Sequence, residues 1–373
     1  MNLTSAIRRL SPKRSRPPRG TPPGTIRGVQ TASPTPTVID VLAYGKNGAN
    51  ETAHHVELRD PDEATIVELL AQHKVVWINI TGLTDVERLK RIGKILNLHP
   101  LALEDSTNLY QRPKIEDYGH YYYVVTRMAD VQHKETELEQ FSLFFGKGFV
   151  LAIQEHKGDC FEPIRARIRG GKTSLYEHGA DFLASALLDA VIDDFFPHIE
   201  RIADLLETLE TNIMARGQKD IVQKIYAMRQ ELMLIRRAIW PLRDALAIMF
   251  REESPLIEAN TKFYFRDCYD HTVQIIDALE SYRDLVSSMM EIYLSSVTYR
   301  LNDIMRTLTV ISTLFMPLNL IAGIYGMNFH GDKSPWNMPE LGWYFGYPFA
   351  LGLMGVVVVV LLISFRLRGW LKS

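Results

Sequence analysis

The chain has little cysteine, and it lacks the residue spacings that most enzyme and redox sites require. Its 373 residues include two cysteines, Cys160 and Cys268, which are too far apart for a paired metal or redox motif and fit a reducing compartment. No His-Glu-x-x-His spacing occurs, so no zinc enzyme is indicated. Gly170–Thr173 resembles the end of a phosphate loop, but Ala166 stands where the first required glycine would be. We therefore expect no enzyme and no ATP site, and the net charge of −2 gives no reason to expect nucleic acid as a partner.

Charge is absent from two long segments near the C-terminus. Leu308–Ile324 and Pro348–Phe365 are runs of 17 and 18 residues without a charged side chain. Helices of roughly 17–25 apolar residues cross a bilayer, where the backbone must satisfy its own hydrogen bonds. The alternative is a pair of buried helices in a soluble protein, but Val356–Ile363 has no polar face for solvent. The pattern predicts two membrane spans and a lipid bilayer as partner.

Positive charges are distributed unevenly around these spans. The loop between them contains one Lys or Arg, Lys333, beside Asp332 and Glu340, whereas several cations flank the spans on the other side. The flanking cations are Arg300, Arg306, Arg366, Arg368 and Lys372. Because Lys and Arg stay on the cytoplasmic side, both termini are expected in the cytoplasm and the loop outside. We expect a multi-pass protein of the bacterial inner membrane, with an organellar membrane as the alternative.

Acidic residues are missing before Asp40, in a segment that carries seven Lys and Arg residues and seven prolines. An Arg-rich start without acids suits an organellar transit peptide, but prolines disfavour the amphipathic helix of such a peptide. Residues 1–37 are therefore expected to form a disordered basic arm that could rest on anionic lipid.

Glycine and proline are both absent from Leu256 to Met316. A helix over these residues would measure about 90 Å, which is three times the thickness of a bilayer core. One helix is therefore expected to begin at Ser254-Pro255, or after a break near Asn260, and to continue from the cytosol into the first span.

An α/β layer followed by long helices is expected between the arm and this helix. Apolar β-like runs lie at Val38–Ala43, Val75–Ile80, Tyr121–Met128, Phe141–Phe145 and Phe149–Gln154, the last two forming a hairpin. Helical patterns lie at Asp62–Gln72, Asp85–Leu96, Phe182–Ala215 and Lys219–Phe250, and Asp193-Asp194 is expected on an exposed helix face. The predicted organisation is an arm (1–37), a cytosolic domain (38–254), a stalk helix continuing into the first span (255–325, span about 305–325), an outer loop (326–347), a second span (348–365) and a basic tail (366–373).

One face of the first span is small or polar at most positions although it lies in an apolar run. This stripe comprises Asn302, Met305, Thr309, Ser312, Met316, Asn319 and Gly323, with Leu308 at its flank. Polar groups inside a membrane usually face a bundle interior or water, which favours a pore. Close packing of two helices through small residues is the alternative. Because two spans cannot enclose a channel, a pore requires a ring of several copies.

The segment that joins the first span to the loop, together with several shorter segments, resembles one known family. Ile321–Phe329 contains Gly326-Met327-Asn328 at the end of the first predicted span. Further matching segments follow one another along the chain: His99-Pro100-Leu101, Leu103-Glu104-Asp105, Gln111-Arg112-Pro113-Lys114, Trp240-Pro241-Leu242-Arg243, Tyr264–Asp267, Tyr269-Asp270-His271, Tyr293–Val297 and Met338–Leu341. The chain resembles the CorA magnesium transporter family over nearly everything after the basic arm.

This resemblance implies a homopentamer with a funnel-shaped cytosolic α/β/α domain and a pore lined by the first span. It implies that Asn328 receives the hydrated ion at the outer mouth and that Asn302 forms a ring near the cytosolic end. Leu308 and Met316 would be hydrophobic constrictions that gate by dewetting. Asn319 departs from the threonine often found in related sequences, which leaves the selectivity of that ring open.

The expected function is influx of Mg²⁺, and also of Co²⁺ and Ni²⁺, driven by the membrane potential. Mg²⁺ dehydrates reluctantly, and a ring of neutral amides can hold its waters without stripping them. The resemblance implies that Asp105 and Asp267, with Glu104 nearby, bind Mg²⁺ at subunit interfaces and hold the pore closed. Glu291 is expected to attract cations to the inner vestibule, and Glu340 belongs to the outer loop. The alternatives are a Zn²⁺ transporter of the ZntB type and a non-conducting membrane-anchored cation sensor.

Overall fold

The computed structural model describes residues 22–26, 35–46, 54–109, 111–129, 138–171, 174–214, 220–327 and 336–370. Most of the predicted basic arm, and also Asn328, Asp332, Lys333 and Lys372, lie outside the described residues. The chain divides into two compact units, which are described separately below. The first is Met1–Asn212 with Gly217–Ser287, and the second is Ile213–Arg216 with Ser288–Ser373.

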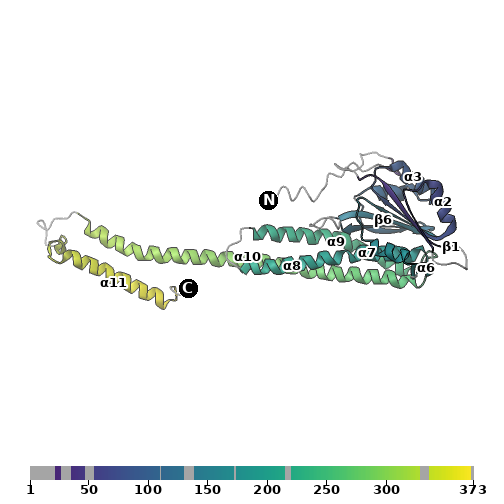
Figure 1. Cartoon of the computed structure of the whole chain (residues 1–373). Helices are drawn as coiled ribbons and strands as arrows, with labels where there is room; N and C mark the ends of the chain where they lie inside the picture. The colour runs from purple at the N-terminus through teal and green to yellow at the C-terminus, as the bar shows by residue number, and fades with distance from the viewer. Residues whose placement is uncertain are drawn as a thin grey trace. The chain divides into compact units, whose positions relative to one another are not determined.

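A seven-stranded sheet is the centre of the first unit (Figure 1). Its strands are β1 (Val38–Lys46), β2 (His55–Arg59), β3 (His73–Thr81), β4 (Lys114–Asp117), β5 (Tyr121–Ala129), β6 (Leu138–Gly146) and β7 (Phe149–Gln154), in the spatial order β2-β1-β3-β7-β6-β5-β4. All neighbours pair antiparallel except β3 and β7, which pair parallel with Val76 opposite Phe149. The sheet thus consists of two antiparallel halves that meet at one parallel pairing.

All five predicted strands are confirmed, including the hairpin of β6 and β7. Its turn places Gly148 at φ +85°, a conformation that favours glycine. The sequence analysis missed β2 and β4, which are the two edge strands of the sheet. Their residues are mostly exposed or half-buried, so neither has the apolar run that marks a central strand.

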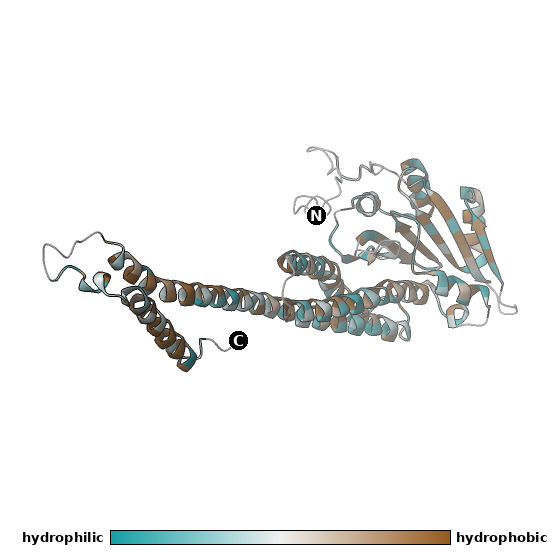
Figure 2. Cartoon of the chain, turned by 60° about the vertical axis from the view of Figure 1, so that its left-hand side comes forward, coloured by the Kyte–Doolittle hydropathy of each residue, from teal (hydrophilic) through white to brown (hydrophobic). Residues whose placement is uncertain are grey.

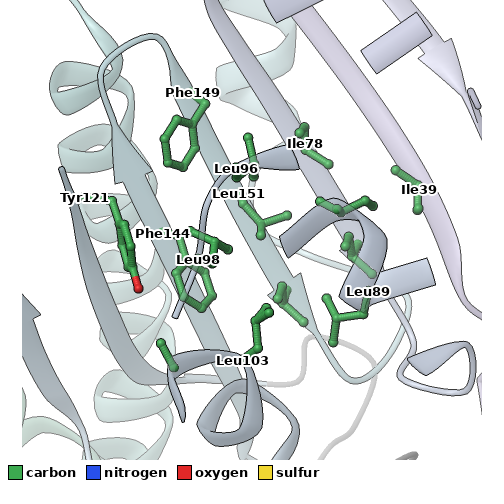
Figure 3. Close-up of a cluster of buried hydrophobic side chains, with 14 of the residues drawn as sticks. Ile39, Ile78, Leu89, Leu96, Leu98, Leu103, Tyr121, Phe144, Phe149 and Leu151 are labelled. Carbon is green, nitrogen blue, oxygen red and sulfur yellow. The ribbon is translucent and has the colours of Figure 1, made fainter. Parts of the chain in front are cut away.

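Three helices cover one face of the sheet: α2 (Glu63–Gln72), α3 (Val86–Ile95) and α4 (Pro100–Thr107). Asp62 and Asp85 cap the first two by accepting hydrogen bonds from the backbone N–H groups of Thr65 and Arg88. Apolar side chains of these helices and of the loop after α3 pack onto the strands, as Leu89, Leu96 and Leu103 do near Ile78 and Leu151 (Figure 3). This core fixes α4 and therefore the backbone of its acidic residues.

Helices α5 (Glu162–Arg169), α6 (Ser174–Glu177), α7 (Ala180–Asp193), α8 (Phe195–Met214) and α9 (Ile221–Arg251) follow the sheet. The single helix predicted over Phe182–Ala215 is wrong, because Asp194 caps the C-terminus of α7 and separates it from α8. On the sheet face opposite α4, the ring of Phe145 stacks on Phe265 with centroids 6.1 Å apart. Phe265 belongs to α10 (Thr261–Tyr325), so the first turns of this long helix pack on the sheet.

Helix α10 begins at Thr261, after turns over residues 255–260, so the predicted start at Pro255 is wrong and the alternative, a break near Asn260, is confirmed. A carboxylate oxygen of Asp181 accepts the backbone N–H of Glu258 at 2.8 Å, which holds these turns against α7. From Thr261 the helix continues through Pro317 to Tyr325.

The second unit contains the end of α10 and α11 (Gly346–Leu367), preceded by the short helix η2 (Pro339–Gly342). Figure 2 shows that apolar residues dominate both segments, and by length and composition α10 and α11 could each cross a membrane. Helix α11 ends in a Schellman cap, with Gly369 at φ +72° and the N–H of Trp370 donated to the carbonyl of Phe365. The rings of Phe365 and Trp370 stack, and Arg306 of α10 donates to the carbonyl of Gly369. The cap therefore ties the end of α11 to α10.

Candidate functional site

The predicted pore stripe lies on one fully exposed face of α10. All its members, and Leu308 at its flank, are exposed, with exposed fractions of 63% for Met305 and Leu308 and 71% for Met316. Half-buried positions fall on a different stripe of α10, at Arg306, Val310, Thr313, Pro317 and Ile321. Helix α11 has a matching half-buried stripe at Ala350, Met354, Val357 and Leu361. Successive residues turn by about 100°, and most pore-stripe members stand one residue before a half-buried position, so the pore stripe lies about 100° around the helix from the half-buried stripe.

The polar members of this stripe remain available to an ion or to water. Thr309 donates its hydroxyl hydrogen to the carbonyl of Met305 at 2.7 Å, so its oxygen presents lone pairs outward. A Cβ added to Gly323 would meet nothing within 4 Å, which shows that the second unit leaves this point of the face open. The face thus alternates hydrogen-bonding groups with the apolar side chains of Leu308 and Met316.

The tripeptide Gly326-Met327-Asn328 follows directly at the end of α10. The N–H of Gly326 donates to Ala322 at 2.9 Å and that of Met327 donates to Ile324 at 3.1 Å, so the chain turns at these residues. Asn328 is the next residue and lies outside the described part. The turn nevertheless fixes where the chain leaves the helix, one residue before the amide proposed to meet the ion.

Glu340 lies in η2 and is half-buried. Its carbonyl oxygen would be 2.1 Å from a Cβ at Gly346, so only glycine fits where α11 begins. This close approach makes the described part of the loop, residues 336–345, compact around η2. It positions a carboxylate on the same loop as the predicted selectivity tripeptide.

Asp105 lies on α4 and is engaged within its own chain. Lys114 of β4 places its ammonium 2.6 Å from Oδ2, and the side-chain amide of Gln111 donates to Oδ1 at 2.6 Å. Burial lowers the pKa of Lys114, but hydrogen bonds from this ammonium to Asp105 and to Glu116 outweigh burial and raise that pKa above its ordinary value. The neighbouring Glu104 accepts the backbone N–H of Gly24 at 2.5 Å, which docks residues 22–26 against α4.

Asp267 lies on α10 and is exposed. It stands on the sheet face opposite α4, since its neighbour Phe265 packs on Phe145 whereas Leu103 of α4 packs in the other core. Within one chain, the described residues therefore do not bring Asp267 and Asp105 together. A site that uses both carboxylates needs a second copy of the chain.

A third group of ligand-type side chains was missed by the sequence analysis. Asp189, Asp193 and His271 hold their ligand atoms within 4.8 Å of one another, with the Nδ1 of His271 3.0 Å from Asp193 and 3.4 Å from Asp189. Burial, and then the charge of Asp193, raises the pKa of Asp189, and Asp267 adds to this effect. Asp193 is exposed, as expected, and is also paired with His271, whereas Asp194 is half-buried. The available signal was the four-residue spacing in Asp189–Asp193 on α7 and in Asp267–His271 on α10, which puts each pair on one helix face.

These donor sets fit a divalent cation. Carboxylate oxygens suit Mg²⁺, and an imidazole beside them also suits Co²⁺ and Ni²⁺. Glu291, the predicted vestibule acid, is exposed on α10 in the second unit and is apart from this group in the sequence.

Comparisons with known proteins agree with this geometry. Residues 72–368 match the model of the CorA-like Mg²⁺ transporter proteins. The cobalt/magnesium transport protein CorA of Thermotoga maritima is 40% identical over 365 residues, which cover 97% of this chain and all of that protein. The protein of the same name from Methanocaldococcus jannaschii is 25% identical, over 90% of this chain and all of that protein.

Solved structures share the fold. The complete CorA magnesium transporter of Methanocaldococcus jannaschii superposes with a TM-score of 0.74 at 22% identity, over 89% of this chain and 98% of that one. The cytoplasmic domain of ZntB from Vibrio parahaemolyticus superposes with a TM-score of 0.57 at 11% identity, over 71% of this chain and all of that domain. The match to the family model over most of the sequence, together with the 40% identity, establishes that this chain belongs to the CorA-like Mg²⁺ transporter family.

Proposed function

We propose that this protein is a homopentameric channel for Mg²⁺ and Co²⁺ influx across the bacterial inner membrane, with both termini in the cytoplasm. The observation that carries the proposal is the exposed face of α10, which is polar or small at most positions and is separate from the half-buried stripe of the same helix. Such a face in a bilayer needs other copies of itself around water. The names of the Thermotoga and Methanocaldococcus relatives supply the ions.

The ion path begins at Asn328 and follows the stripe of α10. Five amide oxygens at one level accept hydrogen bonds from the water shell of Mg²⁺ and hold it weakly enough for release. Asn319 and Asn302 repeat this environment further along. The side chains of Met316 and Leu308 narrow and dry the pathway between the polar levels. The membrane potential supplies ~2.3 kcal/mol per charge per 100 mV, so a dication needs no ATP, and Ni²⁺ passes by the same route.

Closure follows from cation binding at the cytosolic carboxylates. Asp105 of one chain and Asp267 of the partner subunit repel each other unless a cation lies between them. The group of Asp189, Asp193 and His271 adds a second cation site beside Asp267. When cytosolic Mg²⁺ falls, the carboxylates repel, the subunit interfaces loosen and the pore opens.

The test is Mg²⁺ influx into liposomes that contain the purified protein, under an inside-negative potential. Asn328→Ala should abolish influx, while Asn337→Ala, which removes another amide from the same loop, should leave it. Equal influx in Asn328→Ala would place ion selection elsewhere. Influx of Zn²⁺ but not Mg²⁺ would favour a ZntB-type transporter, and no influx of either ion would favour a sensor.

Regulation is tested in the same liposomes with Mg²⁺ inside. Asp267→Ala should keep the influx and lose its inhibition by internal Mg²⁺. Unchanged inhibition would remove Asp267 from the regulatory site and leave the pore assignment intact.

A further inference from the structure

The carboxylate of Asp105 already has partners within its own chain. Its Oδ2 is 2.6 Å from the ammonium of Lys114, and its Oδ1 accepts from Gln111 at the same distance. Both oxygens are therefore engaged by donors of the same chain. A divalent cation that binds Asp105 meets a carboxylate that already has a positive partner.

The position of Lys114 is fixed by more than this one contact. Its ammonium also lies 2.7 Å from an oxygen of Glu116 and 5.6 Å from the ring centroid of Tyr123. The side chain is 29% exposed and that of Asp105 is 24% exposed, so solvent screens the pair only in part. Lys114 belongs to β4, which pairs with β5, and this strand holds the stem of the lysine in place. The ammonium is thus shared by two carboxylates at a well-defined position.

We propose that Lys114 is an internal counter-ion that competes with the divalent cation for Asp105, and so sets the Mg²⁺ concentration at which the regulatory site fills. This inference rests on the proposed regulatory role of Asp105. Two cations near one carboxylate repel each other, so Mg²⁺ binding weakens the contact between Lys114 and Asp105. Glu116 then keeps the ammonium paired, so the exchange leaves no unpaired charge. Without Glu116, displacement of the Lys114 ammonium from Asp105 by Mg²⁺ would leave that ammonium unpaired and would be less favourable.

Removal of the ammonium should strengthen Mg²⁺ binding. In Lys114→Gln, the half-saturating Mg²⁺ concentration should fall about fivefold, as expected from the loss of one partly exposed charge pair. Lys114→Arg keeps the charge, so its half-saturating Mg²⁺ concentration should stay near that of the parent. Lys90→Gln is a matched control, since it removes a lysine paired with Glu87 on α3 of the same unit. Glu116→Gln should act in the opposite direction, because it ties the ammonium to Asp105 alone.

Two readouts should be taken on the full-length protein. The first is the Mg²⁺ dependence of the apparent Tm in detergent, which reports binding without transport. The second is inhibition of influx by internal Mg²⁺ in liposomes. A half-saturating Mg²⁺ concentration that is unchanged or raised in Lys114→Gln would overturn the inference. A lowered half-saturating Mg²⁺ concentration in Glu116→Gln would also overturn it. If Lys114→Gln does not fold, Glu116→Gln alone decides.

Asp105→Asn separates this inference from the proposed function. If this variant keeps the parent's inhibition of influx by internal Mg²⁺, Asp105 is not regulatory and the proposed closure mechanism fails. If Asp105→Asn loses this inhibition while Lys114→Gln leaves the half-saturating Mg²⁺ concentration unchanged, the regulatory role of Asp105 is supported and only the role of Lys114 is refuted.

Discussion

Replacement of Asp193 by Asn should have opposite effects on stability with and without divalent cations. In the absence of cations, Asp189 and Asp193 repel each other across at most 4.8 Å between ligand atoms. At that separation two charges repel by about 3.5 kcal/mol at an effective dielectric constant of about 20. Because the side chain of Asp193 is 50% exposed, solvent reduces this figure to about 1 kcal/mol. In EDTA, Asp193→Asn should therefore raise the apparent Tm by about 2–4 °C.

With Mg²⁺ the same variant should lose stabilisation. A site filled at twenty times its dissociation constant stabilises the fold by about 1.8 kcal/mol. If loss of one carboxylate weakens binding tenfold, the stabilisation falls to about a third of that value. The Mg²⁺-induced rise in Tm should shrink in proportion.

The assay is differential scanning fluorimetry of the detergent-solubilised protein in EDTA and in excess Mg²⁺. Asp277→Asn is the control, since it removes an exposed carboxylate from α10, the helix that carries His271. A variant that is less stable in EDTA and keeps the full Mg²⁺ shift would refute the reasoning. It would show that Asp193 serves the fold through His271 and not a cation.

Three further predictions concern the pore, the pH dependence and the cap of α11. Leu308→Ser should let influx persist at internal Mg²⁺ concentrations that close the parent, because it wets a constriction; normal closure would exclude Leu308 as a gate. The pKa of Asp189 is raised, chiefly by burial, so between that pKa and 3.8 acidification should stabilise the metal-free parent relative to Asp189→Asn. A flat difference in thermal midpoint across that range would contradict this. Arg306→Gln should lower the thermal midpoint by several degrees, since a charged hydrogen bond to Gly369 is worth about 1.5–3 kcal/mol; Arg300→Gln is the control, and an equal loss there would contradict a specific role of the cap.

Central strands and amphipathic stripes could be predicted because their signal is local. Strand β7 is apolar except at its last residue, Gln154, and the pore stripe of α10 repeats at helical spacing, so each is visible without knowledge of its neighbours. Strand β2 could not be predicted in this way because it lies at the edge of the sheet, where three of its five residues are exposed. The sequence left the start of α10 open between Pro255 and a break near Asn260, because Asp181, far away in the sequence, takes the backbone N–H of Glu258 that a longer helix would need.

The candidate regulatory site could be predicted only in part. Glu104, Asp105 and Asp267 came from the family resemblance, whereas the charge partners of Asp105 depend on the packing of α4 next to β4. His271 joins Asp189 only because α7 and α10 pack together. Such juxtapositions leave no periodic trace in the sequence.

The parallel pairing of β3 with β7 has a consequence for folding. In one half of the sheet β1 pairs with β2 and β3, and in the other half β4 to β7 each pair with their sequence neighbours, so each half can form from contacts of shorter range. The pairing that joins the halves brings Val76 next to Phe149 and closes a long loop. Closing this loop lowers the chain entropy before the contacts between β3 and β7 can form and offset that loss. We expect this junction to form last, so an intermediate with two separate half-sheets would expose the edges of β3 and β7 during synthesis. Those unpaired edges are where misassembly of this protein should begin.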